Sequence, residues 1–532
     1  MPDNRCFLEI VVPRRRRRVL TAFLALALAG AALAPQALAQ RVRQSVSPPA
    51  ASTTENPARK PAQEATLPPL PPDAVTAHTV TLGGQKIAYT ARAGTLDLTD
   101  DTGQKIAQIF YIAYTRDGAD KAKRPITFAL NGGPGAASAY LDMGAIGPRV
   151  LDFGGGRSLP LARARLIDNP DSWLDATDLV FIDPVGTGYS VATTSPQDAQ
   201  KYFFGVNQDL QSLGAIIRHA LAKLDRFGSP VYLVGESYGG FRAARLPLTL
   251  ASDEGIAISG TILISPVLEF SLMEGDDFDP LPWALELPSY AAVNLEKHDA
   301  LSAAALKPAE SFALGDYLTA LVAPVEAGDA AAKSDARVAD LIGLPESEVA
   351  RWNGRVPTGV FVKSIHRGEG EVVSRYDGSV AGPDPDPSAY VARRGDPILA
   401  GMTAPLTSGF VAYLRDELNF KTDRRYVLLS GEVGRKWQWG AQGPSDSVGA
   451  ASELARALAL NPHLKVMIAH GMTDLVTPYL ASRYVVDHLP ATVPRDNIAL
   501  KLYPGGHMMY LRPGSRAALH ADAVRLYQPA AE

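Results

Sequence analysis

The serine at position 237 lies in a segment whose spacing suits nucleophilic chemistry. The sequence GESYG occupies residues 235–239, after an apolar run at 231–234 and before a helical stretch at 241–250. A serine on the sharp turn between a buried strand and a helix has a strained backbone, so the residues two before and two after it must be small. Both are glycine here. The pattern and its place in the chain therefore predict that Ser237 is a nucleophile.

Such a serine needs two further side chains. Its hydroxyl is a poor nucleophile without a general base, and the base needs an orienting carboxylate. In folds that carry this turn, the three residues follow in the chain order serine, acid, histidine. Asp474 comes shortly after the apolar run at 465–469, beyond the end of a predicted strand. We therefore expect Asp474 to be the acid.

His507 is the predicted base. Three histidines follow the predicted acid, and two of them, His488 and His520, lie at the end of or within a helical stretch. His507 instead follows the predicted strand 498–503 in a glycine-rich loop, from which an imidazole can reach the serine. The remaining histidines are interpreted as packing or surface residues, including His219 and His470.

A loop after an early strand is the second expected part of the site. Acyl transfer needs hydrogen-bond donors for a developing oxyanion. One is the backbone N–H after the nucleophile, here Tyr238, and the other comes from a loop upstream. The sequence NGGPG at 131–135 follows the apolar run 126–130. A simple turn is the alternative for a segment rich in glycine and proline, but its place after a buried strand favours an oxyanion loop.

The elements that must position these residues alternate between strands and helices. A hairpin with Gly83-Gly84 at its turn comes first, and apolar strands separated by helices such as 208–226 follow. This alternation predicts an α/β class with a mostly parallel central sheet and helices on both faces. Together with the serine turn at 235–239, it suits an α/β-hydrolase fold. Ligands in such sheets bind beyond the carboxyl ends of the strands. The predicted strands are 78–82, 85–91, 107–114, 126–130, 179–182, 231–234, 261–264, 465–469 and 498–503.

The strand pattern is interrupted in the second half of the chain. Alanine-rich, acidic pieces at 302–322 and 331–352 indicate helices, and this region is interpreted as a helical cap inserted into the fold. The predicted organisation is a signal peptide at 1–39, a proline-rich disordered linker at 40–76, the first part of the core at 77–267, the helical cap at 268–422 and the second part of the core at 423–532.

The N-terminal segment has the three parts of an export signal. An arginine run at 14–18 precedes an apolar stretch at 19–34 and the small-residue triplet at 37–39. An uncleaved anchor and a basic nucleic-acid patch are the alternatives, but Pro35 interrupts the stretch near the length that spans a bilayer. We expect export to the periplasm or the medium, with no stable membrane insertion after cleavage. The arginines leave both the general and the twin-arginine export routes open.

Removal of this segment changes the charge of the chain. Cleavage after Ala39 would remove six basic and two acidic residues, which takes the formal net charge from -4 to -8. An acidic exported protein has no electrostatic basis for binding nucleic acid. The single cysteine, Cys6, would leave with the signal, so the mature chain would have no disulfide and no cysteine metal site.

Four separated parts of the sequence resemble the serine carboxypeptidase family. They are NGGPGAAS at 131–138, FIDPVGTGYS at 181–190, GESYGG at 235–240, and the pair GMTD and GGHM near the C-terminal end. The resemblance extends over about residues 126–513 and is weakest in the cap. It implies an α/β-hydrolase fold with a helical insertion, in agreement with the strand and helix pattern.

The family resemblance also implies an activity and a set of site residues. It implies release of C-terminal amino acids from peptides that have a free C-terminus, with no cofactor and no metal. The implied residues are Ser237, Asp474 and His507 as the triad, the backbones of Gly133 and Tyr238 as oxyanion donors, and Asn131, Gly132 and Glu236 as the site for the substrate's carboxylate.

Two positions depart from the family pattern. The family usually has a second glutamate before the residues that correspond to Ile146-Gly147-Pro148, and this chain has Ala145. Two adjacent acids can share a proton, which favours activity at acidic pH, so we expect a rate profile without a strong acid maximum. The family's loop also carries a cysteine where this chain has Ala136, and a looser cap is expected.

Two other functions are compatible with parts of the pattern. One is a different α/β-hydrolase reaction: an esterase, an acyltransferase or an aminopeptidase of the proline iminopeptidase kind. The other is a non-catalytic binding protein that keeps the fold. Asn131, Glu236 and the segment 181–190 favour the carboxypeptidase, and an intact triad in the expected order argues against a binding protein. The residue preferred at the cleavage site and the oligomeric state are not predicted.

Overall fold

The structure is a computed structural model that describes residues 68–153, 164–273, 275, 278–324, 328–392, 395–440 and 448–528. The predicted signal peptide and most of the predicted linker lie outside the described residues. The first strand, β1 (Ala74–Leu82), begins inside the last residues assigned to that linker. Its pairing with β2 through the turn at Gly83 and Gly84, both with positive φ, confirms the predicted hairpin.

A large mixed sheet organises the fold. Its path runs β1-β2-β3-β7-β4-β9-β10-β13-β14, with β8 paired to β3. The strands up to β3 and the β3–β7 pair are antiparallel, and every later neighbour on the path is parallel. The bounds are β2 Gln85–Thr99, β3 Lys105–Arg116, β4 Ile126–Leu130, β7 Asp178–Ile182, β8 Val191–Ala192, β9 Val231–Glu236, β10 Ile258–Ile264, β13 Lys465–Gly471 and β14 Ile498–Tyr503.

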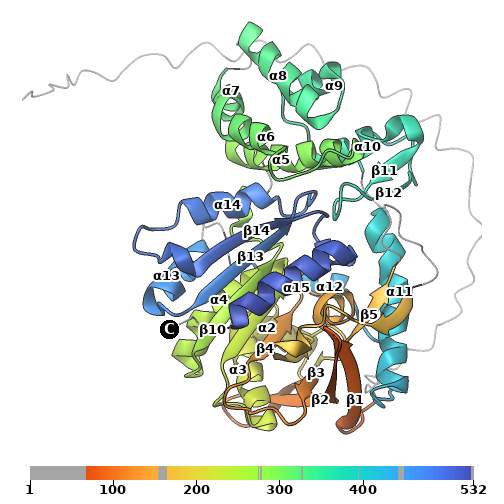
Figure 1. The fold of residues 1–532 in the computed structure, drawn as a ribbon, viewed down its shortest axis with the longest axis vertical. Coiled ribbons are helices and arrows are strands. Elements are labelled where there is room, and N and C mark those ends of the chain that lie inside the picture. The colour runs from red at the N-terminus through yellow and green to blue at the C-terminus, as the bar shows by residue number, and fades with distance from the viewer. Residues whose placement is uncertain are drawn as a thin grey trace, which may run out of the picture. The chain divides into compact units, whose positions relative to one another are not determined.

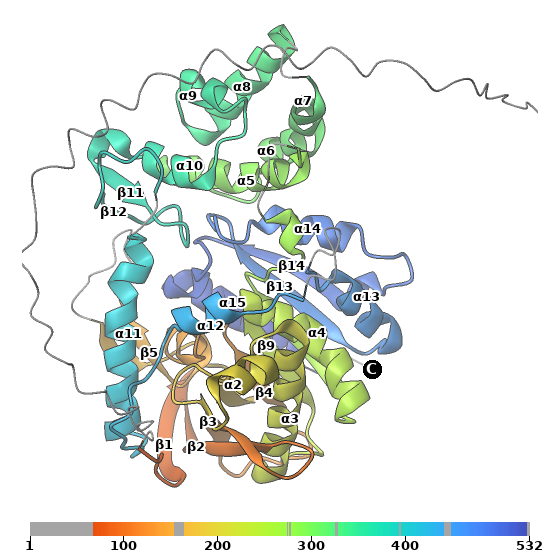
Figure 2. The ribbon, with the colours of Figure 1, turned by 180° about the vertical axis from the view of Figure 1, so that it is seen from behind.

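Helices cover both faces of this sheet. Alternate residues of β9 contribute to two different apolar clusters, because successive strand side chains point to opposite faces. Helices α3, α4 and α13 pack in one cluster, whereas α11 and α15 pack in the other; Figures 1 and 2 show α15 and α3 on opposite faces. The bounds are α2 Pro196–Phe203, α3 Val206–Leu224, α4 Tyr238–Asp253, α11 Pro397–Asp416, α12 Gly431–Lys436, α13 Ala451–Leu460, α14 Tyr479–Asp487 and α15 Pro513–Tyr527.

A third apolar cluster forms the helical cap. It joins the cap helices to α14 and to the loop after β13, which carries Met472 and Leu475. The cap therefore packs directly on the part of the chain that holds the predicted acid. Its elements are α5 Pro280–Lys297, α6 Lys307–Phe312, η4 Ala313–Tyr317, α7 Leu318–Val322, α8 Asp329–Ile342, α9 Glu346–Arg351, α10 Thr358–Ser364, β11 Glu371–Val373 and β12 Ala381–Pro383.

Short elements complete the described chain. Two of them, η1 and η7, flank the candidate site. The bounds are α1 Ala139–Leu141, η1 Asp142–Ile146, β5 Arg149–Asp152, β6 Arg165–Asp168, η2 Trp173–Asp175, η3 Phe270–Leu272, η5 Arg367–Glu369, η6 Arg495–Asn497 and η7 Met509–Leu511.

Some details of the predicted cap differ from the structure. The predicted helix at 331–352 is two helices, because Gly343 ends α8 with a positive φ and Pro345 precedes α9. Helix α11 falls within the predicted cap segment but packs on the core. Among the described helices, α11 is the one long and apolar enough to cross a membrane, and its buried residues, which include Phe410 and Leu414, pack in the core cluster.

Candidate active site

Ser237 occupies a tight turn between β9 and α4. Its backbone has φ 61° and ψ -123°, a strained conformation for a residue with a side chain. A Cβ atom added to Gly235 would collide with the backbone of Gly239, and one added to Gly239 would collide with the carbonyl of Leu130. The backbone is thus too close at both glycines for any side chain, which is why small residues are needed on both sides of the serine. Ser237 itself is half-buried, whereas its neighbours in the turn are buried.

Asp474 and His507 form a buried hydrogen-bonded pair. Asp474 follows β13 and His507 follows β14, as the sequence predicts, and Nδ1 of the histidine lies 2.9 Å from Oδ2 of the aspartate. Because Nδ1 faces the carboxylate, Nε2 is the nitrogen that can accept a proton from a serine hydroxyl. The backbone N–H of His507 also donates to the carbonyl of Tyr376, at 2.5 Å, in the cap segment after β11.

The acid is held by several donors. The N–H groups of Val476 and Thr477 donate to Oδ1 of Asp474 at 2.8 and 3.0 Å, and the Thr477 hydroxyl donates to Oδ2 at 2.7 Å. The same hydroxyl oxygen lies 3.0 Å from the carbonyl oxygen of Ser265, just after β10. The backbone N–H of Ser237 in turn donates to the last residue of β10, so this strand end connects the acid loop to the nucleophile turn.

The electrostatics of the pair suit a general base and its orienting acid. Burial raises the pKa of Asp474, but the charge of and hydrogen bond from His507, with the Thr477 N–H, outweigh burial and keep the pKa below its ordinary value. Burial lowers the pKa of His507, yet the charge of and hydrogen bond to Asp474, with the charge of Glu236, raise it above its ordinary value. A protonated imidazole at His507 would therefore be stabilised by Asp474.

The predicted oxyanion loop packs against the nucleophile turn. The loop follows β4, which is the parallel neighbour of β9. A Cβ atom at Gly132 would lie 2.5 Å from the backbone nitrogen of Tyr238 and 2.9 Å from Cβ of Ser237. Gly133 has φ 103° and is exposed, while its neighbours are buried. Tyr238 is the first residue of α4, so its N–H has no acceptor within the helix. The structure thus brings the start of the predicted loop, at Gly132, against the turn that carries Ser237 and Tyr238.

A buried arginine ties this loop to the helix that follows the serine. Arg242, on α4, donates to the carbonyl of Asn131 at 2.6 Å. It also makes a two-point ion pair with Asp209 on α3, at 2.7 and 2.9 Å. Both side chains are buried. Arg242 is not among the residues predicted from the sequence. It could have been identified as a cation on the apolar face of the helix that follows the serine turn.

Glu236 and Asn131 lie together beside the nucleophile. The Asn131 Oδ1 accepts from the Leu141 N–H at 3.0 Å, so its amide group faces Glu236 as a donor. Burial raises the pKa of Glu236 to about 7, against the opposing charge of His507 and the hydrogen bonds from Tyr510 and Asn131. A carboxyl with this pKa is about half protonated at neutral pH and holds its proton in acidic solution. It can therefore donate that proton to another carboxylate.

The other histidines near the end of the chain have partners of their own. Nε2 of His470 lies 2.8 Å from the Ser482 hydroxyl, and burial lowers the pKa of His470 to about 4. His520 lies in α15 and pairs with Asp175 at 3.0 Å, and His488 follows the end of α14. None of these three side chains is bonded to the acid or the nucleophile in the described part of the chain.

The first part of the core matches a known family. Residues 84–254 match the sequence model of the family described as serine carboxypeptidase. That segment includes the oxyanion loop and the nucleophile turn, and the predicted acid and base lie beyond it. The serine carboxypeptidase resemblance is confirmed. Among curated relatives, serine carboxypeptidase-like 29 of Arabidopsis thaliana is 35% identical over 127 residues, covering 23% of this chain and 24% of that protein.

A second relative and a solved structure extend this likeness. Serine carboxypeptidase-like 41 of Arabidopsis thaliana is 30% identical over 37% of this chain and 43% of its own length. The matched parts are thus less than half the length of these relatives. A solved structure of Kex1(delta)p, a prohormone-processing carboxypeptidase from Saccharomyces cerevisiae, covers 82% of this chain and 91% of that chain with a TM-score of 0.53 and 15% identity. This likeness confirms the α/β-hydrolase fold.

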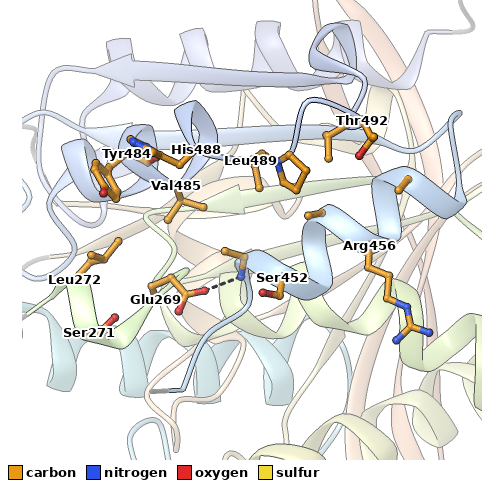
Figure 3. Close-up of a pocket in the computed structure, with 15 residues that line it drawn as sticks. Glu269, Ser271, Leu272, Ser452, Arg456, Tyr484, Val485, His488, Leu489 and Thr492 are labelled. Carbon is orange, nitrogen blue, oxygen red and sulfur yellow. Dashed lines mark hydrogen bonds between the residues drawn. The ribbon is translucent and has the colours of Figure 1, made fainter. Parts of the chain in front are cut away.

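A separate hollow lies between α13, α14 and η3. It has a volume of about 570 Å³, and Figure 3 shows Leu272, Val485 and Leu489 facing it. His488, one of the histidines not chosen as the base, is on its wall. No member of the triad lines this hollow. We assign it no part in acyl transfer.

Proposed function

We propose that this chain is a serine-type carboxypeptidase that hydrolyses the C-terminal peptide bond of peptides and proteins. The observation that carries the proposal is Glu236, a buried carboxyl next to the nucleophile whose pKa burial raises to about 7. With the Asn131 amide, it forms a site that can hold a free carboxylate one residue from the scissile bond. An esterase or an aminopeptidase has no use for such a site.

The proposed reaction proceeds through an acyl-enzyme. His507 Nε2 accepts the proton of the Ser237 hydroxyl as its oxygen attacks the carbonyl carbon, and the N–H groups of Gly133 and Tyr238 stabilise the oxyanion. The histidine then gives its proton to the nitrogen of the departing amino acid. Water attacks the ester in the second half, with His507 again as base, and the shortened peptide leaves with a new carboxyl group.

Peptides with free and amidated C-termini test this proposal. We expect the enzyme to release the last residue of the free peptide at least about a hundredfold faster in kcat/KM, because the amide removes the charge that Glu236 and Asn131 bind. Chromatography and mass spectrometry of the products measure the rate and the site of cleavage. Cleavage that is indifferent to amidation, or removal of N-terminal residues, would contradict the assignment and favour the other hydrolase reactions.

The pH dependence is a second expected result. His507 must be neutral to act as a base, so kcat/KM should rise with pH through its pKa, which Asp474 and Glu236 raise above the ordinary 6.5. Glu236 must be protonated to bind a carboxylate, so kcat/KM should fall above its pKa of about 7, which burial sets. The profile should therefore be a narrow maximum near neutrality. A maximum at about pH 4 to 5, the carboxylate range, would contradict this account.

We also propose export to the periplasm or the medium. The arginine run, the apolar stretch and the small residues before position 40 support this, and no part of that segment belongs to the described residues. The substrates would then be extracellular or periplasmic peptides. The N-terminal sequence of the protein recovered outside the cytoplasm is expected to begin at Gln40. Recovery of the protein in the cytoplasm with its first residues intact would contradict export.

A further inference from the structure

A buried tyrosine is hydrogen-bonded to the carboxyl beside the nucleophile. Tyr510 lies in η7, three positions after His507, and its hydroxyl donates to Oε2 of Glu236. The side chain of Tyr510 is 0% exposed, and Glu236 is 5% exposed. The acyl-transfer steps make no use of this hydroxyl. Its partner is the group proposed to hold the substrate's carboxylate.

The ring of Tyr510 packs on the segment where the family has its second acid. A Cβ atom added to Gly144 would lie 3.0 Å from Cε2 of the tyrosine, so the backbone of η1 is in contact with the ring. The next residue, Ala145, is 1% exposed and has no polar side chain. The hydroxyl of Tyr510 therefore reaches Glu236 from beside the position that a second carboxyl would occupy.

A phenol and a second carboxyl would affect the protonation of Glu236 differently. Two neighbouring carboxyls share one proton, and they repel each other and the substrate once that proton is lost. Burial, then the charge of Glu236, raises the pKa of Tyr510 well above its ordinary value, so the phenol remains a donor throughout the working range. It can donate to Oε2 whether Glu236 is neutral or charged. The proton of a neutral Glu236 then belongs on Oε1.

We infer that Tyr510 is a positioning residue that takes the place of the missing acid: its hydroxyl holds Glu236 and lowers the upper pH limit at which the enzyme binds a substrate's terminal carboxylate. This inference rests on the proposed carboxypeptidase function. It predicts that binding of the C-terminus depends on the proton of Glu236 alone, without a second titrating carboxyl.

Several other groups face Glu236 and must be included in any pH argument. Burial is the largest influence and raises its pKa; the charge of His507 and the hydrogen bonds from Tyr510 and Asn131 lower it, while the charge of Asp474 raises it. Removal of the Tyr510 hydroxyl should therefore raise the pKa of Glu236 further. The titratable groups that interact with Glu236 are His507, Asp474, Tyr510, Tyr140 and Tyr376.

Tyr510→Phe tests this inference through KM measured against pH. For a peptide with a free C-terminus, we expect KM below neutrality to increase about tenfold, because Glu236 loses one hydrogen bond that orients it. The alkaline rise in KM should move up by about one pH unit, the size of one hydrogen bond to a charged group. The change in kcat should be less than about threefold, because the triad retains its contacts.

A matched variant separates this effect from the general cost of removing a buried hydroxyl. Tyr479 donates to Oε1 of Glu310 at 3.0 Å, which is a second buried tyrosine–glutamate pair, in contact with the cap. Tyr479→Phe should leave the alkaline rise in KM at the wild-type pH. Glu236→Gln should remove the rise, and Tyr510→Phe added to Glu236→Gln should cause no further shift, because the tyrosine acts through Glu236.

The possible outcomes are distinct. The inference is overturned if a folded Tyr510→Phe enzyme shows the alkaline rise in KM at the wild-type pH. It is also overturned if Tyr510→Phe raises KM as much in the Glu236→Gln variant as in the wild type. Should the phenylalanine variant fail to fold, 4-aminophenylalanine in place of Tyr510 keeps a donor at the end of a ring of the same size and is expected to keep the alkaline rise in KM within about half a pH unit of wild type; a rise displaced further overturns the inference. Wild-type enzyme that binds free and amidated peptides equally would instead refute the proposed function.

Discussion

Ser237→Ala is expected to lower kcat for release of a C-terminal residue by about six orders of magnitude, the loss that removal of a triad serine causes elsewhere. The structure explains why no neighbour can substitute. Ser237 occupies the strained turn at φ 61°, and its N–H donates to the carbonyl of Ile264 at the end of β10, at 2.9 Å. Single-turnover assays with a peptide of free C-terminus measure the residual rate.

The fold should survive this substitution. An alanine at Ser237 removes only a half-buried hydroxyl, and the backbone strain is unchanged because alanine retains Cβ. Ser252→Ala, on the exposed end of the same helix, is the matched control and should retain wild-type turnover. A Ser237→Ala enzyme with substantial activity would refute the assigned nucleophile, whatever the substrate. Unchanged thermal unfolding of both variants would confirm that their difference in turnover does not come from a loss of folded protein.

The strand ends that the sequence predicted for the three candidate catalytic residues agree with the structure, because each residue follows an apolar strand, and their catalytic roles stay predictions. Ser237, Asp474 and His507 follow β9, β13 and β14, and local hydrophobic patterns identify such strands reliably. In a parallel sheet, successive carboxyl ends meet at one edge. Chain order and strand ends were therefore enough to select the acid and the base from several candidates. The 2.9 Å contact between Asp474 and His507 is the direct consequence.

The residues that support the site could not be found in this way. Tyr510 and Glu236 are separated by 274 positions, and Arg242 and Asp209 by 33, so no short pattern contains either pair. Whether a tyrosine hydroxyl is buried against a carboxyl depends on how η1 and η7 pack. The departure at Ala145 was visible in the sequence, but the group that compensates for it was not.

The cap shows a second limit of the sequence patterns. Composition indicated helices there, yet it did not show that the segment after β11 approaches the catalytic loops. Tyr376 accepts from the His507 N–H, and the Leu475 N–H donates to the carbonyl of Arg375. Arg512 adds ion pairs to Asp377 and Glu296. These contacts join the cap to the loops that carry Asp474 and His507 through hydrogen bonds and ion pairs. The expectation of a looser cap stays a prediction.

Asp474→Asn is expected to lower kcat by about four orders of magnitude while the fold persists. The carboxylate accepts from two N–H groups, the Thr477 hydroxyl and His507 Nδ1. An amide has one acceptor oxygen, so its NH₂ group must face either these donors or the imidazole. If it faces His507, Nδ1 becomes an acceptor, Nε2 carries the hydrogen, and the base can no longer take the serine's proton. Pre-steady-state kinetics with the free peptide measure the loss.

The residual activity of Asp474→Asn should also have a shifted pH dependence. Burial lowers the pKa of His507, and the charge of and hydrogen bond to Asp474 raise it; without that charge, the acid limb of kcat/KM should move to lower pH. The matched control is Asp175→Asn, which removes the charge of the Asp175–His520 pair, 3.0 Å long and outside the site. This control should change neither kcat nor the pH at which kcat/KM falls on the acid side. If kcat/KM of Asp474→Asn fell on the acid side at the same pH as in the wild type, a group other than His507 would be responsible for that fall. A loss below about tenfold would mean that His507 is oriented by Thr477, whose hydroxyl lies 3.1 Å from Nδ1, and not by the aspartate.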